Sequence, residues 1–436
     1  MKENTKKEKR KLLKRFNKKW IIVLTSLLLI TAVVFTACSS AVTTTTPQPT
    51  STTQVISTTT PSTTSAVTTS PTTTLIPTST TTQPTSTTST TTPVITSTTP
   101  PATTTTSSLP IVPLNGAGGT FPAPLYTSWF ATYAKLTGVQ VNYQAVGSGA
   151  GITAITNNTV DFGASDAIMT STQVTAAQAS NGTLLTIPTT MGAVAIIYNI
   201  NGLGNYQLKL TGNVLAGIYL KSITNWDDPA IVALNPGANL PHSAIAVVHR
   251  SDSSGTSYIF TNYLAQVSKQ WSTQVGVATA VNWPGDVGGS GSAGVSVYVQ
   301  DLTGSIGYVE LAYAVQNNLA VAQMQNSSGT FITPSVASAS AAADGVTLPA
   351  NMLVMITNSS NPTAYPITGF TWLLVYQNQK DQAKGQELVN LLWWILTSAQ
   401  QYNNALTYPA LPASAVAIAE AEVNSMTYNG QALHHN

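Results

Sequence analysis

The chain has 436 residues and a formal net charge of +2, but this charge is unevenly distributed. Ten of the 17 basic residues lie between Lys2 and Lys19, which leaves seven basic against thirteen acidic residues beyond Lys19, a net charge of −6. An acidic body excludes nucleic acid as the partner, because neutralising phosphodiesters requires a basic face. Only 7% of the residues are charged, and Arg250 is the sole arginine beyond the amino-terminal segment.

The first 37 residues have the pattern of a secretion signal. Residues 20–37 are apolar, follow the basic stretch and end in small residues before Cys38, the only cysteine of the chain. This pattern resembles a bacterial lipoprotein signal, in which the cysteine becomes the lipidated amino terminus. We therefore predict a signal peptide at 1–37 and an extracytoplasmic protein anchored to the membrane through Cys38. The alternative is an uncleaved membrane-spanning helix, because about 18 apolar residues just suffice to cross a bilayer.

The composition of residues 38–110 predicts a disordered stalk that begins at this cysteine. From residue 41 to residue 109 the sequence consists almost wholly of Thr, Ser and Pro. Such a composition buries too little apolar surface to offset the entropy lost on ordering. We therefore expect no binding chemistry in this segment.

The remaining residues, 111–436, are numerous enough for two α/β lobes. A strand is expected at 111–115, and a helix at 123–136, where Leu125, Trp129, Tyr133 and Leu136 share one face. Alternating apolar residues predict a strand at 139–145. Further strands are expected at 191–199, 244–249, 305–310 and 369–376, and a long amphipathic helix at 381–401. Because helices separate the strands, the pattern predicts parallel sheets of the βαβ kind. Trp226, Trp393 and Trp394 are expected to pack in the core.

Three segments combine glycine with hydroxyl residues between a strand and a helix: 116–121, 147–151 and 251–256. A helix amino terminus presents unpaired N–H groups and the positive end of the dipole, and glycine lets an anion approach the backbone. The three segments together therefore favour an anion site. Taken singly, each is better explained as an ordinary helix cap.

Arg250 and Asp166 give this anion site its chemical character. The planar guanidinium of Arg250 suits an oxyanion, and Asp252, two residues on, is placed to hold it; the alternative is a surface salt bridge between the two. A carboxylate at Asp166 suits a ligand that carries a proton, such as hydrogen phosphate, and repels fully ionised sulfate. Otherwise Asp166 caps the next helix.

Four segments resemble the PstS family of periplasmic phosphate-binding proteins: 115–124, 160–166, 246–257 and 306–310. The resemblance extends from residue 114 to about residue 412. It implies an α/β, two-lobed periplasmic-binding-protein fold of type II with two hinge crossings and the ligand between the lobes. One lobe is expected to hold 111–189 plus 365–436, and the other 190–364. The resemblance also implies that the protein captures hydrogen phosphate and delivers it to an ABC-type permease, without a cofactor.

The same resemblance assigns roles to individual residues. Asp166 accepts the proton of the ligand, Asp252 orients Arg250, and Phe121 donates through its backbone N–H. The remaining donors to phosphate are Thr120, Ser148, Arg250, Ser254, Gly255 and Thr256. The chain departs from the family at Gly149, where some relatives have serine, at Ser253, where glycine is common, and at His249, where a basic residue is common.

Three other functions compete with phosphate binding. In a hydrolase, His249 with Ser251 or Ser254 is an imaginable catalytic pair, but neighbouring residues seldom reach that geometry and no metal-binding motif is present. The second competing function is binding of sulfate, molybdate or an organic anion by the same fold. The third is that of a cell-surface adhesin. We expect a monomeric binding protein, not an enzyme, with no metal at His434 and His435.

Overall fold

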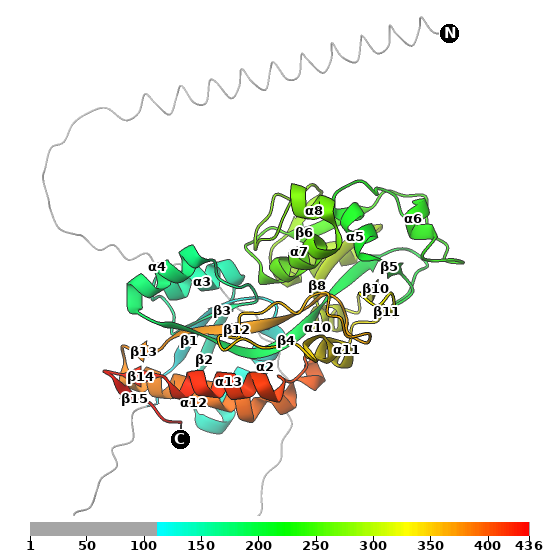
Figure 1. Ribbon diagram of the computed structural model, residues 1–436. Helices are drawn as coiled ribbons and strands as arrows, with labels where there is room; N and C mark the ends of the chain where they lie inside the picture. The colour runs from blue at the N-terminus through cyan, green and yellow to red at the C-terminus, as the bar shows by residue number, and fades with distance from the viewer. Residues whose placement is uncertain (1–110, 436) are drawn as a thin grey trace, which may run out of the picture. The chain divides into compact units, whose positions relative to one another are not determined.

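The structure is a computed structural model that describes residues 111–435 as a mixed α/β protein (Figure 1). The predicted signal peptide, Cys38 and the predicted stalk lie outside the described residues. Among the residues described, no helix combines the length and apolarity needed to cross a bilayer.

A nine-stranded sheet in the order β2-β1-β3-β12-β4-β8-β6-β7, with β9 paired to β4, forms the framework. Its strands are β1 (Leu114–Gly118), β2 (Val141–Ala145), β3 (Phe162–Ser165), β4 (Leu184–Asn199), β6 (Ala246–Arg250), β7 (Val287–Gly289), β8 (Ser305–Glu310), β9 (Ala320–Val321) and β12 (Thr368–Tyr376). Two small three-stranded sheets flank it, one of β5 (Lys209–Leu210), β10 (Gln323–Gln325) and β11 (Phe331–Ile332), the other of β13 (Asn378–Gln379), β14 (Thr427–Tyr428) and β15 (Gln431–Ala432).

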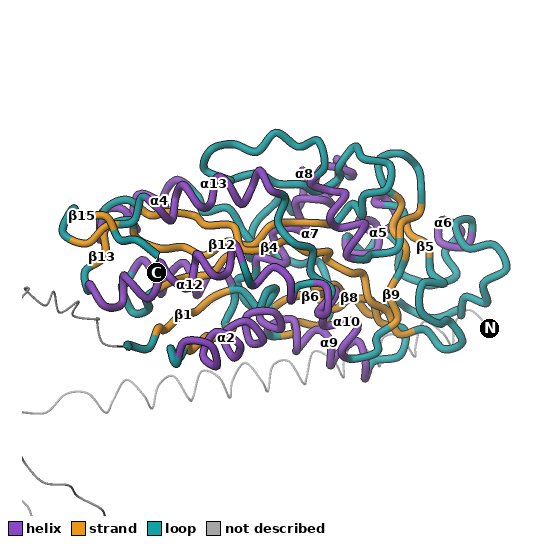
Figure 2. The backbone as a smooth tube through the Cα atoms, turned by 90° about the horizontal axis from the view of Figure 1, so that it is seen from below, coloured by secondary structure: helices purple, strands orange, loops and turns teal. Residues whose placement is uncertain are grey.

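Helices cover the sheet on several sides, as the tube in Figure 2 shows. They are α2 (Ala123–Thr137), α3 (Ser148–Thr156), α4 (Ser171–Asn181), α5 (Gly212–Tyr219), α6 (Pro229–Val232), α7 (Gly255–Val267), α8 (Lys269–Gln274), α9 (Gly291–Asp301), α10 (Leu311–Gln316), α11 (Val336–Ser340), α12 (Gln382–Thr397) and α13 (Ala413–Asn424). Short 3₁₀ turns occupy Ala341–Ala343, Ala399–Tyr402 and Asn404–Leu406.

Strand β4 joins two halves of the sheet by changing partners along its length. Its residues 184–193 pair with β12, and its residues 194–199 pair with β8 (Figure 1). Both pairings are antiparallel, whereas β1 with β2 and β3, and β6 with β7 and β8, are parallel. The prediction of parallel sheets was therefore wrong for the centre, because β4 leaves the first half of the sheet and β12 returns to it in the opposite direction.

Most predicted elements are present within a few residues, with two corrections. The first is β4, which begins seven residues before the predicted strand. The missed part contains Pro188, which lacks the N–H that a central strand needs. Proline is tolerated here because it pairs with Trp372 at an irregularity in the register between Thr371 and Trp372.

The second correction concerns Leu136 in α2, which is 64% exposed. The buried stripe of α2 ends at Tyr133, whose ring packs 5.2 Å from that of Trp394, and Leu136 lies at the exposed carboxyl end. Gly138 ends the helix in a left-handed conformation. At the other end of the chain, the predicted helix 381–401 is α12 followed by a 3₁₀ turn.

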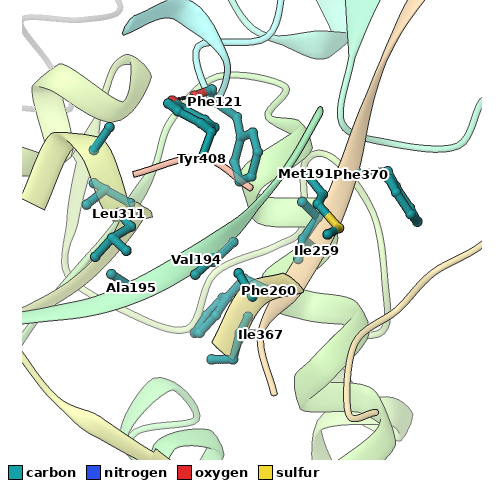
Figure 3. Close-up of a cluster of buried hydrophobic side chains, with 14 of the residues drawn as sticks. Phe121, Met191, Val194, Ala195, Ile259, Phe260, Leu311, Ile367, Phe370 and Tyr408 are labelled. Carbon is teal, nitrogen blue, oxygen red and sulfur yellow. Dashed lines mark hydrogen bonds between the residues drawn. The ribbon is translucent and has the colours of Figure 1, made fainter. Parts of the chain in front are cut away.

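A continuous hydrophobic core fills the space where β4 and β12 run together. Figure 3 shows Phe121, Met191, Phe370 and Tyr408 there, and each is at most 1% exposed. Trp226 is fully buried, as predicted. Burying side chains of this size stabilises the fold by roughly 2–3 kcal/mol each, so the loops above this core rest on a rigid base.

Candidate functional site

The three predicted loops meet in the structure at one buried place. Each precedes or begins a helix: 118–121 lead into α2, 147–148 into α3 and 251–255 into α7. The residues predicted to contact the ligand are all buried, Gly255 among them. The others, each at most 6% exposed, are Thr120, Phe121, Ser148, Asp166, Arg250, Ser254 and Thr256.

The backbone of the first loop is fixed by two tyrosines. Tyr313 donates a hydrogen bond of 2.7 Å to the carbonyl of Thr120, and Tyr408 donates one of 2.6 Å to the carbonyl of Phe121 (Figure 3). Because a trans peptide is planar, holding the Thr120 carbonyl directs the following N–H, that of Phe121, to the opposite side. The loop therefore offers an oriented backbone donor.

The second loop places Ser148 beside Asp166. Its hydroxyl accepts from the Asp166 N–H at 3.1 Å and donates to Asp166 Oδ2 at 3.3 Å. The turn depends on Gly147, which has φ +94°, and a Cβ there would lie 2.6 Å from Asp252 Oδ2. The same glycine thus allows the second loop to approach the third.

Asp166 is a buried carboxyl group with polar neighbours. Thr371 donates to its Oδ1 at 2.7 Å, while Ser148 bonds its Oδ2. Burial raises the pKa of Asp166 to about 6, against the lowering effects of the Thr371 hydrogen bond and the Arg250 charge. The alternative that Asp166 caps the next helix was wrong, because α4 begins at Ser171 with Thr170 as its cap.

Arg250 is held rigidly by its own neighbours. Its Nε donates to Asp252 Oδ1 at 2.7 Å, and its Nη2 donates to Asp252 Oδ2. The predicted pair with Asp252 thus exists, but it is not on the surface, because the Arg250 side chain is only 1% exposed. Burial raises the pKa of Asp252, but the hydrogen bond and charge of Arg250 outweigh this and lower it.

The third loop supplies the start of α7. Ser254 does cap this helix, because its hydroxyl accepts from the Ser257 N–H at 3.1 Å, but its own proton remains able to donate. A Cβ on Gly255 would collide with Asp166 Oδ2 and with Ser148 Oγ. Only glycine therefore lets this backbone lie against the second loop and Asp166.

The three ionisable side chains of the site, Arg250, Asp252 and Asp166, carry no net positive charge above about pH 6. Arg250 is neutralised by Asp252, and Asp166 carries a negative charge above its pKa of about 6. Net positive charge therefore does not hold an anion here. Backbone N–H groups and hydroxyls at three helix starts must provide most of the binding, with Arg250 as the one charged donor.

One residue at this place was missed by the sequence analysis. Ser292, at the start of α9, is fully buried, and its hydroxyl lies 3.0 Å from Thr120 Oγ1 and 3.3 Å from Arg250 Nη1. The preceding Gly291 donates its N–H to Asp252 at 3.0 Å. The segment 288–292, Gly-Gly-Ser-Gly-Ser, has the same glycine and hydroxyl composition as the three predicted loops, and this signal was available.

Two departures from the family meet in the structure. Gly149 donates its N–H to the carbonyl of Ser253 at 3.0 Å, and a Cβ on Gly149 would collide with the Ser253 side chain. The Ser253 hydroxyl instead bonds Thr279 at 2.8 Å. The glycine at one position therefore makes room for the serine at the other.

This contact predicts a compensating pair of substitutions. Gly149→Ser alone should weaken anion binding by about tenfold or more, because overpacking at a buried contact costs about 1–3 kcal/mol. Gly149→Ser combined with Ser253→Gly should restore it, and Ser253→Gly alone should have little effect. Calorimetric titration of the three variants checks this. If Gly149→Ser alone and the double variant bound the anion equally well, the contact would be refuted.

Known proteins match the chain in sequence and in fold. A profile described as PBP superfamily domain matches residues 44–392. The phosphate-binding protein PstS of Xylella fastidiosa (strain 9a5c) is 41% identical over 312 residues, covering 71% of this chain and 84% of that protein. PstS of Pasteurella multocida is 40% identical over 311 residues (71% and 89%), and PstS of Methanocaldococcus jannaschii is 35% identical over 328 residues (70% and 84%).

Solved structures share the fold. The crystal structure of a DING protein superposes with a TM-score of 0.59 at 25% identity, covering 71% of this chain and 93% of that one. A periplasmic phosphate-binding protein, PfluDING, solved with phosphate, gives a TM-score of 0.57 at 23% identity, covering 72% and 98%. The architecture is thus the two-lobed periplasmic-binding-protein fold.

Proposed function

The chain belongs to the PstS phosphate-binding proteins of the PBP superfamily, and from this premise we propose that it captures inorganic phosphate and delivers it to an ABC-type import permease. It is a substrate-binding protein rather than an enzyme. The observation that carries the choice of ligand is Asp166, a buried carboxyl group that shares one site with Arg250 and three helix starts.

The proposed binding follows from donors and acceptors. Hydrogen phosphate presents oxygens that accept hydrogen bonds and one hydroxyl that donates. The donors are Arg250, the hydroxyls of Thr120, Ser254 and Thr256, and the N–H groups of Phe121 and Gly255. The Ser148 hydroxyl joins them by turning its proton from Asp166 Oδ2 to the ligand. Asp166 is the acceptor for the ligand's proton. A ligand without that proton places a charged oxygen against the buried carboxylate with no hydrogen between them, so the two groups repel instead of forming a hydrogen bond.

The arrangement opposes the hydrolase alternative. The His249 ring stacks on Trp283 with ring centroids 5.0 Å apart, and its Nδ1 lies 3.0 Å from the carbonyl of Arg250. His249 is thus engaged away from Ser251 and Ser254.

Calorimetry with phosphate and with p-nitrophenyl phosphate tests the proposed function. Protein freed of phosphate by unfolding and refolding should bind one inorganic phosphate per chain. The ester should neither bind nor release nitrophenol. Sustained release, or ester binding as tight as that of phosphate, would argue for a different function.

We also propose the finer organisation expected from the sequence. The exchange of β4 partners between Ala193 and Val194 supports hinge crossings near residues 190 and 365, with lobes of 111–189 plus 365–436 and of 190–364. The protein is proposed to be an extracytoplasmic monomer lipidated at Cys38. Mass spectrometry of the mature protein tests this anchor, and an intact Met1 terminus would contradict it.

A further inference from the structure

The start of α9 contacts both the first loop and the Arg250–Asp252 pair. Ser292 Oγ lies 3.0 Å from Thr120 Oγ1 and 3.3 Å from Arg250 Nη1, and the Ser292 N–H donates to Thr120 Oγ1 at 3.3 Å. Gly291 donates to Asp252 Oδ1 at 3.0 Å. Thr120 precedes α2, next to the first half of the sheet, whereas Arg250 ends β6 in the second half. Ser292 therefore connects two parts of the site that come from different halves of the sheet.

The donor count fixes the direction of one of these hydrogen bonds. Arg250 has no acceptor, so its Nη1 donates to Ser292 Oγ. Between Ser292 Oγ and Thr120 Oγ1 either hydroxyl can donate, and we take Ser292 as the donor, with Thr120 Oγ1 also receiving the Ser292 N–H. With its acceptor capacity used, the Thr120 hydroxyl keeps its own proton to donate elsewhere.

We propose that Ser292 is a positioning residue of the phosphate site. Its hydrogen bonds to Arg250 and Thr120, called the latch below, hold the two lobes together and orient the Thr120 hydroxyl as a donor to the anion. This rests on the proposed function. Each hydrogen bond in the series Arg250–Ser292–Thr120 polarises the next, so the guanidinium strengthens the donor at Thr120 without touching it. The latch joins the lobes only in the closed state, and it therefore retards release of the ligand more than its entry.

A purely structural role for Ser292 predicts different behaviour, and α9 offers a matched control. Ser296 lies one turn further along α9, is 2% exposed, and donates its hydroxyl to the Ser292 carbonyl at 3.0 Å. Ser290, the residue before the helix, makes no side-chain capping bond. Ser296→Ala therefore removes a buried α9 hydroxyl of the same kind without changing the proposed latch.

The test is stopped-flow and equilibrium phosphate binding by the full chain and its variants. Ser292→Ala should bind phosphate ~10-fold more weakly, mainly through faster dissociation. Ser296→Ala should match the wild type, and Ser292→Thr, which keeps the hydroxyl, should stay within ~3-fold of it. In a Thr120→Val background, Ser292→Ala should add less than its separate effect, because the two residues act through one bond.

Each outcome has a distinct meaning. If the wild type binds phosphate but Ser292→Ala and Ser296→Ala weaken binding equally, the latch is refuted while the phosphate function stands. A tenfold loss in Ser292→Thr, or fully multiplicative effects with Thr120→Val, also overturns the latch. If the wild type binds no phosphate, the proposed function itself fails, and the latch fails with it.

Discussion

Arg250→Ala is expected to weaken phosphate binding by about 1,000-fold. The guanidinium is the one charged donor assigned to the ligand, and it lies fully buried against Asp252. Its loss removes a charge-assisted hydrogen bond and leaves the Asp252 carboxylate uncompensated beside an incoming dianion. Truncating one partner of a buried charge pair costs about 2–5 kcal/mol, and about 4 kcal/mol corresponds to a thousandfold change.

Two further variants separate these causes. Arg250→Ala combined with Asp252→Ala should bind better than Arg250→Ala alone, because the uncompensated carboxylate is gone. Lys221→Ala is the control, since Lys221 forms an exposed pair with Asp286 outside the site and should leave binding unchanged. Calorimetry measures all three. Binding by Arg250→Ala within about tenfold of the wild type would show that the site is misplaced.

Asp166→Asn is expected to change which anion binds. An amide in place of the carboxyl group can donate to sulfate, whereas it loses the strong acceptor for the proton of phosphate. Sites that pair a ligand hydroxyl reject analogues without it by ~10⁴-fold or more, and most of that discrimination should disappear. Asp301→Asn, at the exposed carboxyl end of α9, is the matched control and should keep the wild-type preference.

The raised pKa of Asp166 gives this prediction a pH dependence. With a pKa of about 6, the carboxyl group is protonated as pH falls from 8 to 5 and becomes a donor. Sulfate binding by the wild type should therefore strengthen as pH falls through about 6. Asp166→Asn should show little of this change. A wild-type sulfate affinity that is constant between pH 5 and 8 would contradict the role given to Asp166.

The raised pKa of Asp166 also makes the free energy of unfolding depend on pH. Because folding raises the pKa of Asp166, the folded ligand-free protein prefers the protonated form. This contribution to the free energy of unfolding is complete below the unfolded pKa near 4 and disappears as pH rises through about 6. Phosphate bound as proposed should offset this loss near neutral pH by a hydrogen bond to Asp166, so thermal unfolding with and without phosphate should differ more at pH 7 than at pH 4.

Local signals explain why much of the site was predictable. A turn of glycine and hydroxyl residues before a helix is a signal contained in a few neighbouring residues. The loops at Thr120, Ser148 and Ser254 could therefore be identified without a structure. The role proposed for Asp166 was suggested by its charge, because a carboxylate near an anion site needs a proton to accept, although the sequence alone left open that it capped the next helix. The resemblance to the family then joined these segments into one site.

Contacts between distant residues explain what was missed. Gly149 and Ser253 are far apart in sequence, and nothing local shows that one makes room for the other. Ser292 belongs to a loop without charge, so its contact with Thr120 appears only when the sheet halves are brought together. The antiparallel centre of the sheet was likewise hidden, because β12 reaches β4 from the far end of the chain.

Calorimetric titration of the wild-type protein with phosphate and sulfate at pH 8 tests the central claim most directly. The claim is that a site without net positive charge selects its anion by the proton that Asp166 accepts. It predicts saturable binding of one phosphate and sulfate binding weaker by ~10⁴-fold or more. Comparable affinities for the two anions would contradict it.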